Sequence, residues 1–114
     1  TYSDMCIGPE GLVYGIADGK KFFVFDPLNR VIVHHQEIDT IIGKTVAYQS
    51  PRIFVKGPEN EIYLIFAKGI VKVDTEFKLK MVAESPLKIQ AGGDYLDGRI
   101  YFVCGSHICS YKLK

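Results

Sequence analysis

The 114-residue sequence lacks tryptophan, an excess of either charge and any long apolar run. It has 14 Lys and Arg against 13 Asp and Glu, a net charge of +1. A surface that binds nucleic acid or an anionic membrane needs a basic excess, so we expect neither partner. No run approaches 18 consecutive apolar residues, and we therefore expect no membrane-spanning helix.

Cysteine is also scarce, with only Cys6, Cys104 and Cys109. Three is an odd number, which excludes a closed disulfide framework. Free cysteines behave as small buried hydrophobic residues, and we expect these three to do so. They are in keeping with a reducing, cytoplasmic compartment. No Asn-x-Ser/Thr acceptor occurs, so glycosylation gives no hint of secretion.

A helical pattern is missing as well. No window has apolar residues sustained at helical spacing, and the apolar runs are four to six residues long, bounded by Gly, Pro, Asp and Asn. There are 23 Ile and Val against 12 Leu and Ala, with 14 Phe and Tyr. β-Branched and aromatic residues favour pleated strands. The sequence therefore predicts an all-β fold.

Three tyrosines share a local pattern. Each follows a β-branched residue, with Gly or Asn three positions before it and an acid four positions before it, which are turn residues. The segments are Glu10-Gly11-Leu12-Val13-Tyr14, Glu59-Asn60-Glu61-Ile62-Tyr63 and Asp97-Gly98-Arg99-Ile100-Tyr101. The tyrosines are 49 and 38 residues apart. Periods of about 40 to 50 residues that each hold several short strands are typical of a β-propeller.

The period divides the chain into one propeller segment with blades near 1–48, 49–86 and 87–114. Each blade is expected to be a four-stranded antiparallel sheet, except that the last lacks its outer strand. The expected strands are Met5–Ile7, Leu12–Ala17, Lys21–Asp26, Val31–His35, Arg52–Lys56, Ile62–Phe66, Ile70–Asp74, Phe77–Val82, Lys88–Ala91, Arg99–Cys104 and His107–Leu113.

A segment of about three blades is expected to need partners. Propellers generally close with four or more blades, and neighbouring blades bury each other's faces. Three blades alone would expose two apolar faces and an unpaired strand edge. The chain is therefore expected to be part of a longer propeller or to form a homo-oligomer, for example a dimer with a six-bladed ring.

The segments Ile7-Gly8-Pro9-Glu10-Gly11-Leu12-Val13-Tyr14 and Phe23-Val24-Phe25-Asp26-Pro27 resemble a known repeat. It is the blade repeat of the superfamily of gluconolactonase-like hydrolases, streptogramin lyases and NHL-type binding modules. The resemblance extends over nearly the whole chain and implies a propeller fold. In the lactonase-like branch, carboxylates and amides from several blades hold a central metal. The two asparagines, Asn29 and Asn60, lie at expected turns, not on inner strands.

Several acids recur at matching positions. Glu10, Glu59 and Asp97 precede the tyrosine strands, and Asp26 and Asp74 end the strands that follow in the first two blades. An active site is asymmetric, whereas a turn is needed in every blade. We therefore interpret all five as structural: Glu10, Glu59 and Asp97 as turn residues, and Asp26 and Asp74 as acids that bond backbone amides in the turns after their strands.

Cys104, His107 and Cys109 form the one cluster with ligand chemistry. A two-residue turn between residues 104 and 107 would place Cys104 opposite His107, with Cys109 diagonal to Cys104 on the same face. Zinc needs four ligands, and only a residue such as Cys6 would complete them. We interpret the cluster as packing and expect no metal and no cofactor.

A binding site in a propeller is expected at the mouth of the channel, on loops next to the inner strands. The residues that meet this condition are Asp4, Tyr48, Gln49, Arg52, Gln90, Asp94 and Tyr95. Next to them, Gly92 and Gly93 mark either a bulge or a close approach by a ligand, and we favour the bulge.

These observations favour a non-catalytic binding or interaction module, with a small molecule or a protein as its ligand. One alternative is a lactonase- or lyase-like hydrolytic propeller whose active site is completed by residues outside this chain. Another is a sugar-binding propeller assembled from several chains, in which tyrosines replace the missing tryptophan as the aromatic platform.

Overall fold

The computed structural model describes residues 2–18, 20–38 and 53–113. These residues form eleven strands in three antiparallel sheets of four, four and three strands. The prediction of an all-β fold with this division of strands is confirmed. Within the described residues, the longest helical segments are single 3₁₀ turns, so none has the length or apolar character to cross a membrane.

In each sheet the strands pair in chain order, so every connection within a sheet is a hairpin. The first sheet contains β1 (Tyr2–Ile7), β2 (Val13–Ala17), β3 (Lys21–Asp26) and β4 (Val31–Glu37). The second contains β5 (Phe54–Lys56), β6 (Ile62–Phe66), β7 (Gly69–Val73) and β8 (Leu79–Glu84). The third contains β9 (Ala91–Leu96), β10 (Arg99–Cys104) and β11 (His107–Lys112).

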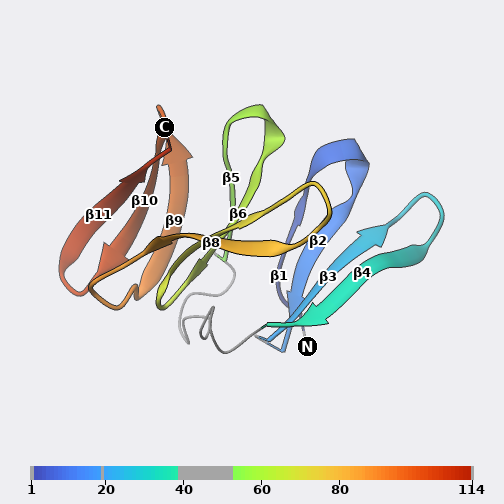
Figure 1. The fold of residues 1–114 in the computed structure, drawn as a ribbon, viewed down its shortest axis with the longest axis horizontal. Coiled ribbons are helices and arrows are strands. Elements are labelled where there is room, and N and C mark those ends of the chain that lie inside the picture. Colours follow the sequence, from blue (N-terminus) through green and yellow to red (C-terminus); the bar gives the residue numbers. More distant parts are fainter. Residues whose placement is uncertain (1, 19, 39–52, 114) are drawn as a thin grey trace.

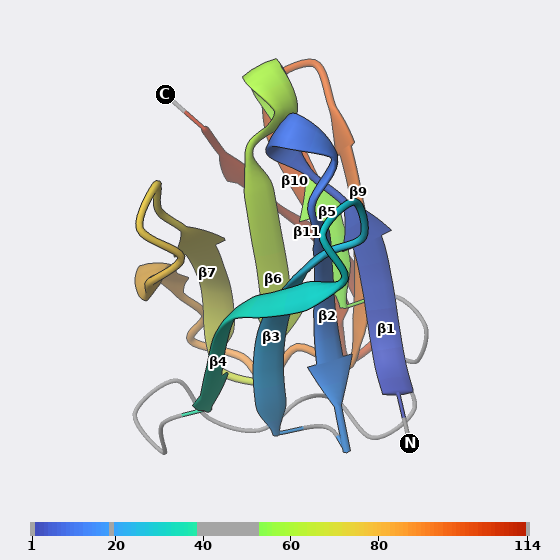
Figure 2. The ribbon, with the colours of Figure 1, turned by 90° about the vertical axis from the view of Figure 1, so that its right-hand side faces the viewer.

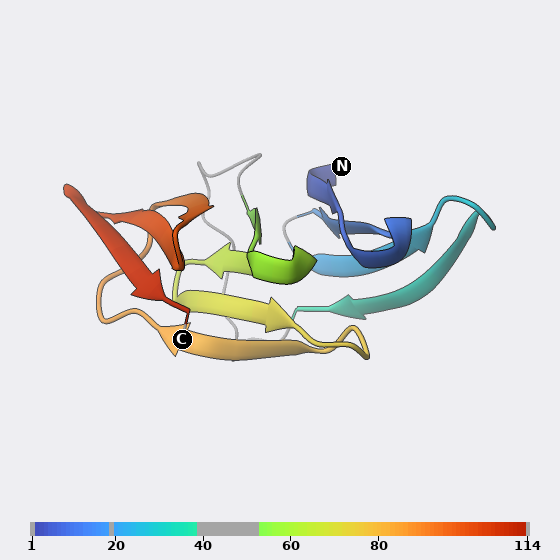
Figure 3. The same cartoon turned by 90° about the horizontal axis from the view of Figure 1, so that it is seen from above.

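The three sheets stand in a row, with their faces packed against each other (Figure 1). The first strands lie together, since β1 contacts β5 and β5 contacts β9. Figure 3 shows these three strands gathered along one side of the molecule. The N-terminus lies on the first sheet and the C-terminus on the third, at opposite ends of the row (Figure 1).

Two apolar clusters hold the row together. The first lies between the first and second sheets and includes Ile16, Phe22 and Leu64. The second lies between the second and third sheets and includes Ile65 and Ile100. Side chains alternate between the faces of a strand, so the second sheet contributes one face to each cluster. Its strand β6 is consequently buried at all five positions.

The repeated acid and its successor form a left-handed pair in each sheet. Glu59 and Asn60 have φ of 56° and 65°, and Glu10 and Gly11 have φ of 60° and 74°. In the third sheet Asp97 and Gly98, with φ of 48° and 85°, form the two-residue turn between β9 and β10. The interpretation of the acids as turn residues is confirmed.

Two of the predicted strands are wrong. The first strand of the third sheet is β9, not Lys88–Ala91, because β9 continues through a bulge that leaves Gly93 unpaired. A Cβ atom on Gly93 would lie 2.4 Å from the carbonyl oxygen of Tyr101 and 2.6 Å from Ile65 Cδ1. Glycine is therefore required where β9 approaches both neighbours, and the bulge interpretation is confirmed.

The last strand of the second sheet begins at Leu79, not at Phe77. Phe77 lies in the β7–β8 turn with φ of 67°. Its ring leaves the sheet and packs against Tyr14 and His34 of the first sheet. The apolar side chain of Phe77 therefore serves a contact between two sheets and does not mark a strand position.

Candidate functional site

Asp4, predicted at a channel mouth, joins two sheets. It lies in β1, and its Oδ2 atom accepts hydrogen bonds from the backbone N–H groups of Ile53 at 2.7 Å and Phe54 at 2.9 Å. Its Oδ1 atom accepts the N–H group of Met5. Both carboxylate oxygens therefore bind backbone amides, and Asp4 connects the first strands of the first and second sheets.

Gln90, Asp94 and Tyr95 do not form a common site with Asp4. Asp94 lies in β9, not in a loop, and is exposed, and its Oδ1 atom accepts the N–H group of Tyr95. Tyr95 is half-buried against the second apolar cluster. Gln90 is exposed, and its N–H group donates to the carbonyl of Val103. None of them lines the cavity between Ile70 and Tyr111 or the one beside Phe23 and Ile32.

The remaining three predicted site residues, Tyr48, Gln49 and Arg52, lie outside the described residues. The prediction of a channel-mouth site therefore stays a prediction. Asp4 and Asp94, both predicted for this site, differ in what their carboxylates contact. The carboxylate of Asp4 is engaged on the neighbouring sheet, whereas that of Asp94 is exposed on the last sheet.

Asp26 and Asp74 bind the turns that follow their strands, as predicted. Asp26 accepts the N–H groups of Leu28 and Asn29 and the side-chain amide of Asn29. Asp74 accepts the N–H groups of Glu76 and Lys78. These hydrogen bonds lower the pKa of both carboxyls. The two acids are structural residues of equivalent turns.

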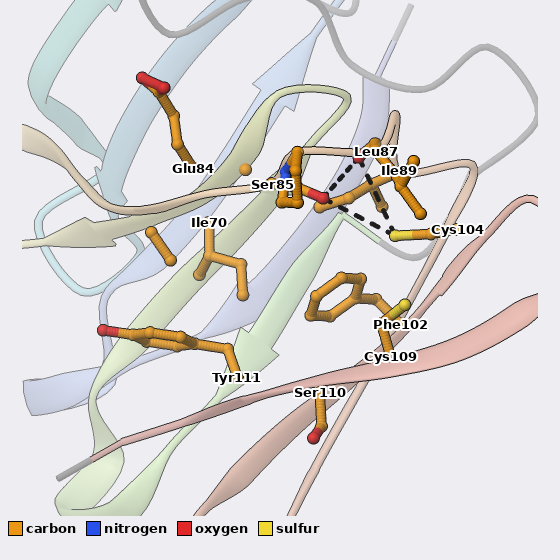
Figure 4. Close-up of a pocket in the computed structure, with 13 residues that line it drawn as sticks. Ile70, Glu84, Ser85, Leu87, Ile89, Phe102, Cys104, Cys109, Ser110 and Tyr111 are labelled. Atoms are coloured by element: carbon orange, nitrogen blue, oxygen red, sulfur yellow. Dashed lines mark hydrogen bonds between the residues drawn. The ribbon is translucent and has the colours of Figure 1, made fainter.

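A cavity of about 190 Å³ opens between the second and third sheets (Figure 4). Its walls are mainly apolar and include Ile70, Phe102 and Tyr111. The Cys104 thiol lies against the Ser85 hydroxyl at 3.8 Å, and this hydroxyl donates to the carbonyl of Leu87. Sequence analysis missed this cavity because residues from four separate segments enclose it.

The Cys104 thiol at this cavity and the Cys6 thiol beside the first cluster are poor nucleophiles. Burial raises the pKa of the Cys104 thiol, the Ser85 contact lowers it, and the neighbouring Cys109 raises it further. Burial also raises the pKa of Cys6 to about 12. Nucleophilic cysteines need a depressed pKa. The prediction that the cysteines are buried is confirmed for Cys104, while Cys6 and Cys109 are half-buried.

Cys104 and His107 form a cross-strand pair, and Cys109 pairs with Phe102. The predicted two-residue turn is therefore confirmed. Cys109 lies beside Cys104, whereas His107 is exposed. In the part of the chain that the structure describes, no group of three or more His, Cys, Asp or Glu side chains is placed to hold a metal ion.

Two sheet faces, one at each end of the row, are not covered by the described part of the chain. Figure 2 shows the first sheet in front of the other two. We define its open face by the apolar residues Met5, Ile7, Phe25 and Ile32 of β1, β3 and β4, which point away from the second sheet and share this face with Lys21, His35 and Glu37. All except the half-buried Phe25 are exposed.

The open face of the third sheet carries exposed apolar side chains beside the polar Asp94, Arg99, Ser110 and Lys112. We define it by Leu96, Tyr101, Val103 and Ile108, since Val103 pairs directly with Ile108 and Tyr101 alternates with the buried residues of β10. Ile108 is 81% exposed and Leu96 is 62% exposed. Contiguous exposed apolar residues mark interaction surfaces. These two open faces are the strongest candidate functional site of the chain.

The repeated tyrosines distinguish the covered faces from the open one. Tyr14 packs toward the second sheet and Tyr63 toward the third, and each is 4% exposed. Tyr101 has no described sheet beyond it and is 37% exposed. The exposure of Tyr101 thus follows from its place at the end of the row.

Comparison of the chain with protein-family models finds no match, and comparison with curated proteins finds none at a significant level.

Proposed function

We propose that this chain is a non-catalytic interaction module made of three consecutive β-propeller blades, with the two open faces as its binding surfaces. The observation that carries the proposal is a series of matching positions. Phe22 is fully buried against the second sheet, and Ile70 is 1% exposed against the third. Ile108, at the same position of the third sheet, is 81% exposed. The position is apolar in all three sheets, but it is covered in only two.

The other face of each sheet, which carries Val13, Ile62 or Ile100, supports the same proposal. Ile62 packs toward the first sheet, and Ile100 packs toward the second; both are buried. Val13, at the matching position of the first sheet, has no described sheet before it and is half-buried. Each sheet therefore presents one set of positions to the sheet before it and another to the sheet after it. This arrangement is expected of blades around a common axis.

The adjacent first strands of the three sheets indicate where the axis of the proposed propeller lies. In a propeller the innermost strands of successive blades surround a central channel. The contacts β1–β5 and β5–β9, together with the Asp4 bonds to Ile53 and Phe54, support this role for the three strands.

The polar groups favour interaction over catalysis. His34 packs at tilted angles against Phe22 and Phe77 and hydrogen-bonds Gln36. The Ser85 hydroxyl donates to a backbone carbonyl, and the Cys104 beside it has a raised pKa. A nucleophile requires an adjacent base or a lowered pKa. These three groups instead serve packing and turn formation.

A tandem fusion tests the proposal. The fusion joins two copies of the chain by a linker of about 20 Gly and Ser residues. This linker spans on the order of 25 Å. If the open faces are blade interfaces, they will cover each other within the fusion. We expect a compact monomeric fusion with a higher melting temperature than the single chain. It should also bind less of an apolar dye, such as anilinonaphthalene sulfonate, per copy.

The control is the same fusion with Ile32→Glu and Ile108→Glu in both copies. These substitutions place charges on both open faces and should restore dye binding and the lower melting temperature. An unmodified fusion with the single chain's melting temperature and dye binding per copy would contradict the proposal.

A further inference from the structure

We infer that the open face of the third sheet binds the open face of the first sheet of a second copy of this chain, head to tail. The inference rests on the blade arrangement proposed above and names the partner. Two copies packed in this way would form a closed ring of six sheets, with two equivalent interfaces.

The first argument is the pairing of positions in the covered interfaces. Between the first and second sheets, Tyr14 and Phe22 meet Ile62 and Val71 in one apolar cluster. Between the second and third sheets, Tyr63 and Ile70 take the places of Tyr14 and Phe22. In both interfaces, the face of one sheet that carries the repeated tyrosine packs against the opposite face of the next sheet.

The open faces carry the two members of this pairing. Tyr101 and Ile108 on the third sheet continue the series of Tyr14 and Phe22. Phe25 on the first sheet matches Val73, which is buried in the first cluster. A second copy therefore supplies the kind of face that each open face lacks, in the orientation that the chain already uses twice.

The second argument is the direction of packing. A symmetric dimer through one face would place Ile108 against Ile108, or Ile32 against Ile32. Neither covered interface joins two like faces. A head-to-tail contact repeats the observed combination instead, and such a contact closes into a ring when the rotation allows it.

The third argument is the number of sheets. Propellers have about four to eight blades. One copy contributes three sheets. Two copies give six, which lies within this range, whereas three copies give nine. The two open faces lie at opposite ends of the row (Figure 1).

The test uses one charged substitution on each face. Ile32→Glu changes the first sheet only, and Ile108→Glu changes the third sheet only. Each variant alone has no pair of intact faces, so we expect its self-association to weaken roughly 100-fold or more, as expected for a buried unpaired charge. A mixture of the two variants retains one intact interface. It should form a dimer more tightly than either variant alone, although less tightly than the unmodified chain.

Masses from sedimentation equilibrium decide the outcome. Recovery of the dimer in the mixture supports the head-to-tail contact. A dimer formed by either variant alone would show a symmetric interface through the other face and would overturn it. Leu28→Glu is the matched control, because Leu28 is exposed in the β3–β4 turn, away from both faces. This variant should associate like the unmodified chain.

Two further readouts separate the possible failures. Circular dichroism and a cooperative melt show whether each variant is folded, and Ile32→Ser and Ile108→Ser replace any Glu variant that is not. If the single chain stays monomeric while the tandem fusion closes, the second copy is excluded and the blade arrangement stands. If the fusion also remains open, the blade arrangement itself fails.

Discussion

Strands β6 and β10 are nearly equal in apolar character but differ in burial. The sequence of β6 is Ile-Tyr-Leu-Ile-Phe, and that of β10 from Ile100 is Ile-Tyr-Phe-Val-Cys. All five residues of β6 are buried, whereas β10 alternates between buried residues and the less buried Tyr101 and Val103. Strands that are apolar at successive positions are typical of sheets covered on both faces. The sequence of β10 is therefore suited to a neighbour on each side.

The first sheet differs from the second in the same way, on its other face. Phe25 of β3 is half-buried, and Ile32 beside it is exposed, whereas Val73 of β7 is buried. The central sheet is covered by a described sheet on each face. Each end sheet is covered by a described sheet on one face, and the residues that differ are those on the open faces.

The largest expected effect comes from the central sheet. Phe66 is fully buried, and Phe66→Ala should lower the free energy of unfolding by about 3–5 kcal/mol, because it removes buried area and leaves a cavity. Urea denaturation of the dilute chain measures this change. Ile108→Ala is the matched substitution on an open face and should change the value by less than about 0.5 kcal/mol under the same conditions. Equal losses for the two variants would remove the distinction between central and end sheets.

A smaller effect is expected at the contact between the first two sheets. Asp4→Ala would leave the N–H groups of Ile53 and Phe54 without their acceptor, which should cost about 1–3 kcal/mol. Asp94→Ala removes an exposed carboxylate that, among the described residues, accepts the N–H group of the next residue, so we expect a loss below about 0.5 kcal/mol. Urea denaturation compares the two variants. An Asp94 variant as unstable as the Asp4 variant would be inconsistent with a special role for Asp4.

The smallest effect on stability is expected at the turns after Asp26 and Asp74, which are alike in the first and the central sheet. Hydrogen bonds from Lys78 and Glu76 hold the pKa of Asp74 below its usual value of about 3.9. In the first sheet, hydrogen bonds from Asn29, followed by one from Leu28, lower the pKa of Asp26. Because the folded pKa is the lower one, this stabilisation is complete above about pH 3.9 and is lost as the pH falls through the folded pKa.

Asp74→Asn and Asp26→Asn should therefore each make the urea midpoint fall less steeply between about pH 4 and pH 2. The control is Thr75→Ala, which leaves the Asp74 carboxylate in place. Because these turns are local, the two Asn variants should behave alike although only one lies in the central sheet. A pH dependence identical to that of the unmodified chain would contradict the assignment of these hydrogen bonds.

Local patterns made much of the fold predictable. The left-handed pairs at Glu10, Glu59 and Asp97, and the hairpin between Cys104 and His107, depend on residues adjacent in sequence. The first strand of the third sheet was mispredicted because Asp94 and Tyr95 were expected in a loop after the two glycines, while the close approach of Ile65 to Gly93 depends on another sheet.

The candidate site was less predictable, since it depends on contacts between sheets. Asp4 shows no sequence signal for its bonds to amides 49 and 50 residues away. The open faces did have a signal, namely apolar positions on both faces of every sheet. This pattern did not identify which faces are open. The structure does so, because it places Tyr101 and Ile108 on a side of the third sheet that no described residue covers.

The mass of the unmodified chain in solution tests the central claim most directly. Sedimentation equilibrium over a range of concentrations measures it without a variant or a label. The head-to-tail contact between open faces predicts a species of twice 12.8 kDa that does not grow further, because the ring is closed. A single species of 12.8 kDa at every concentration would contradict it.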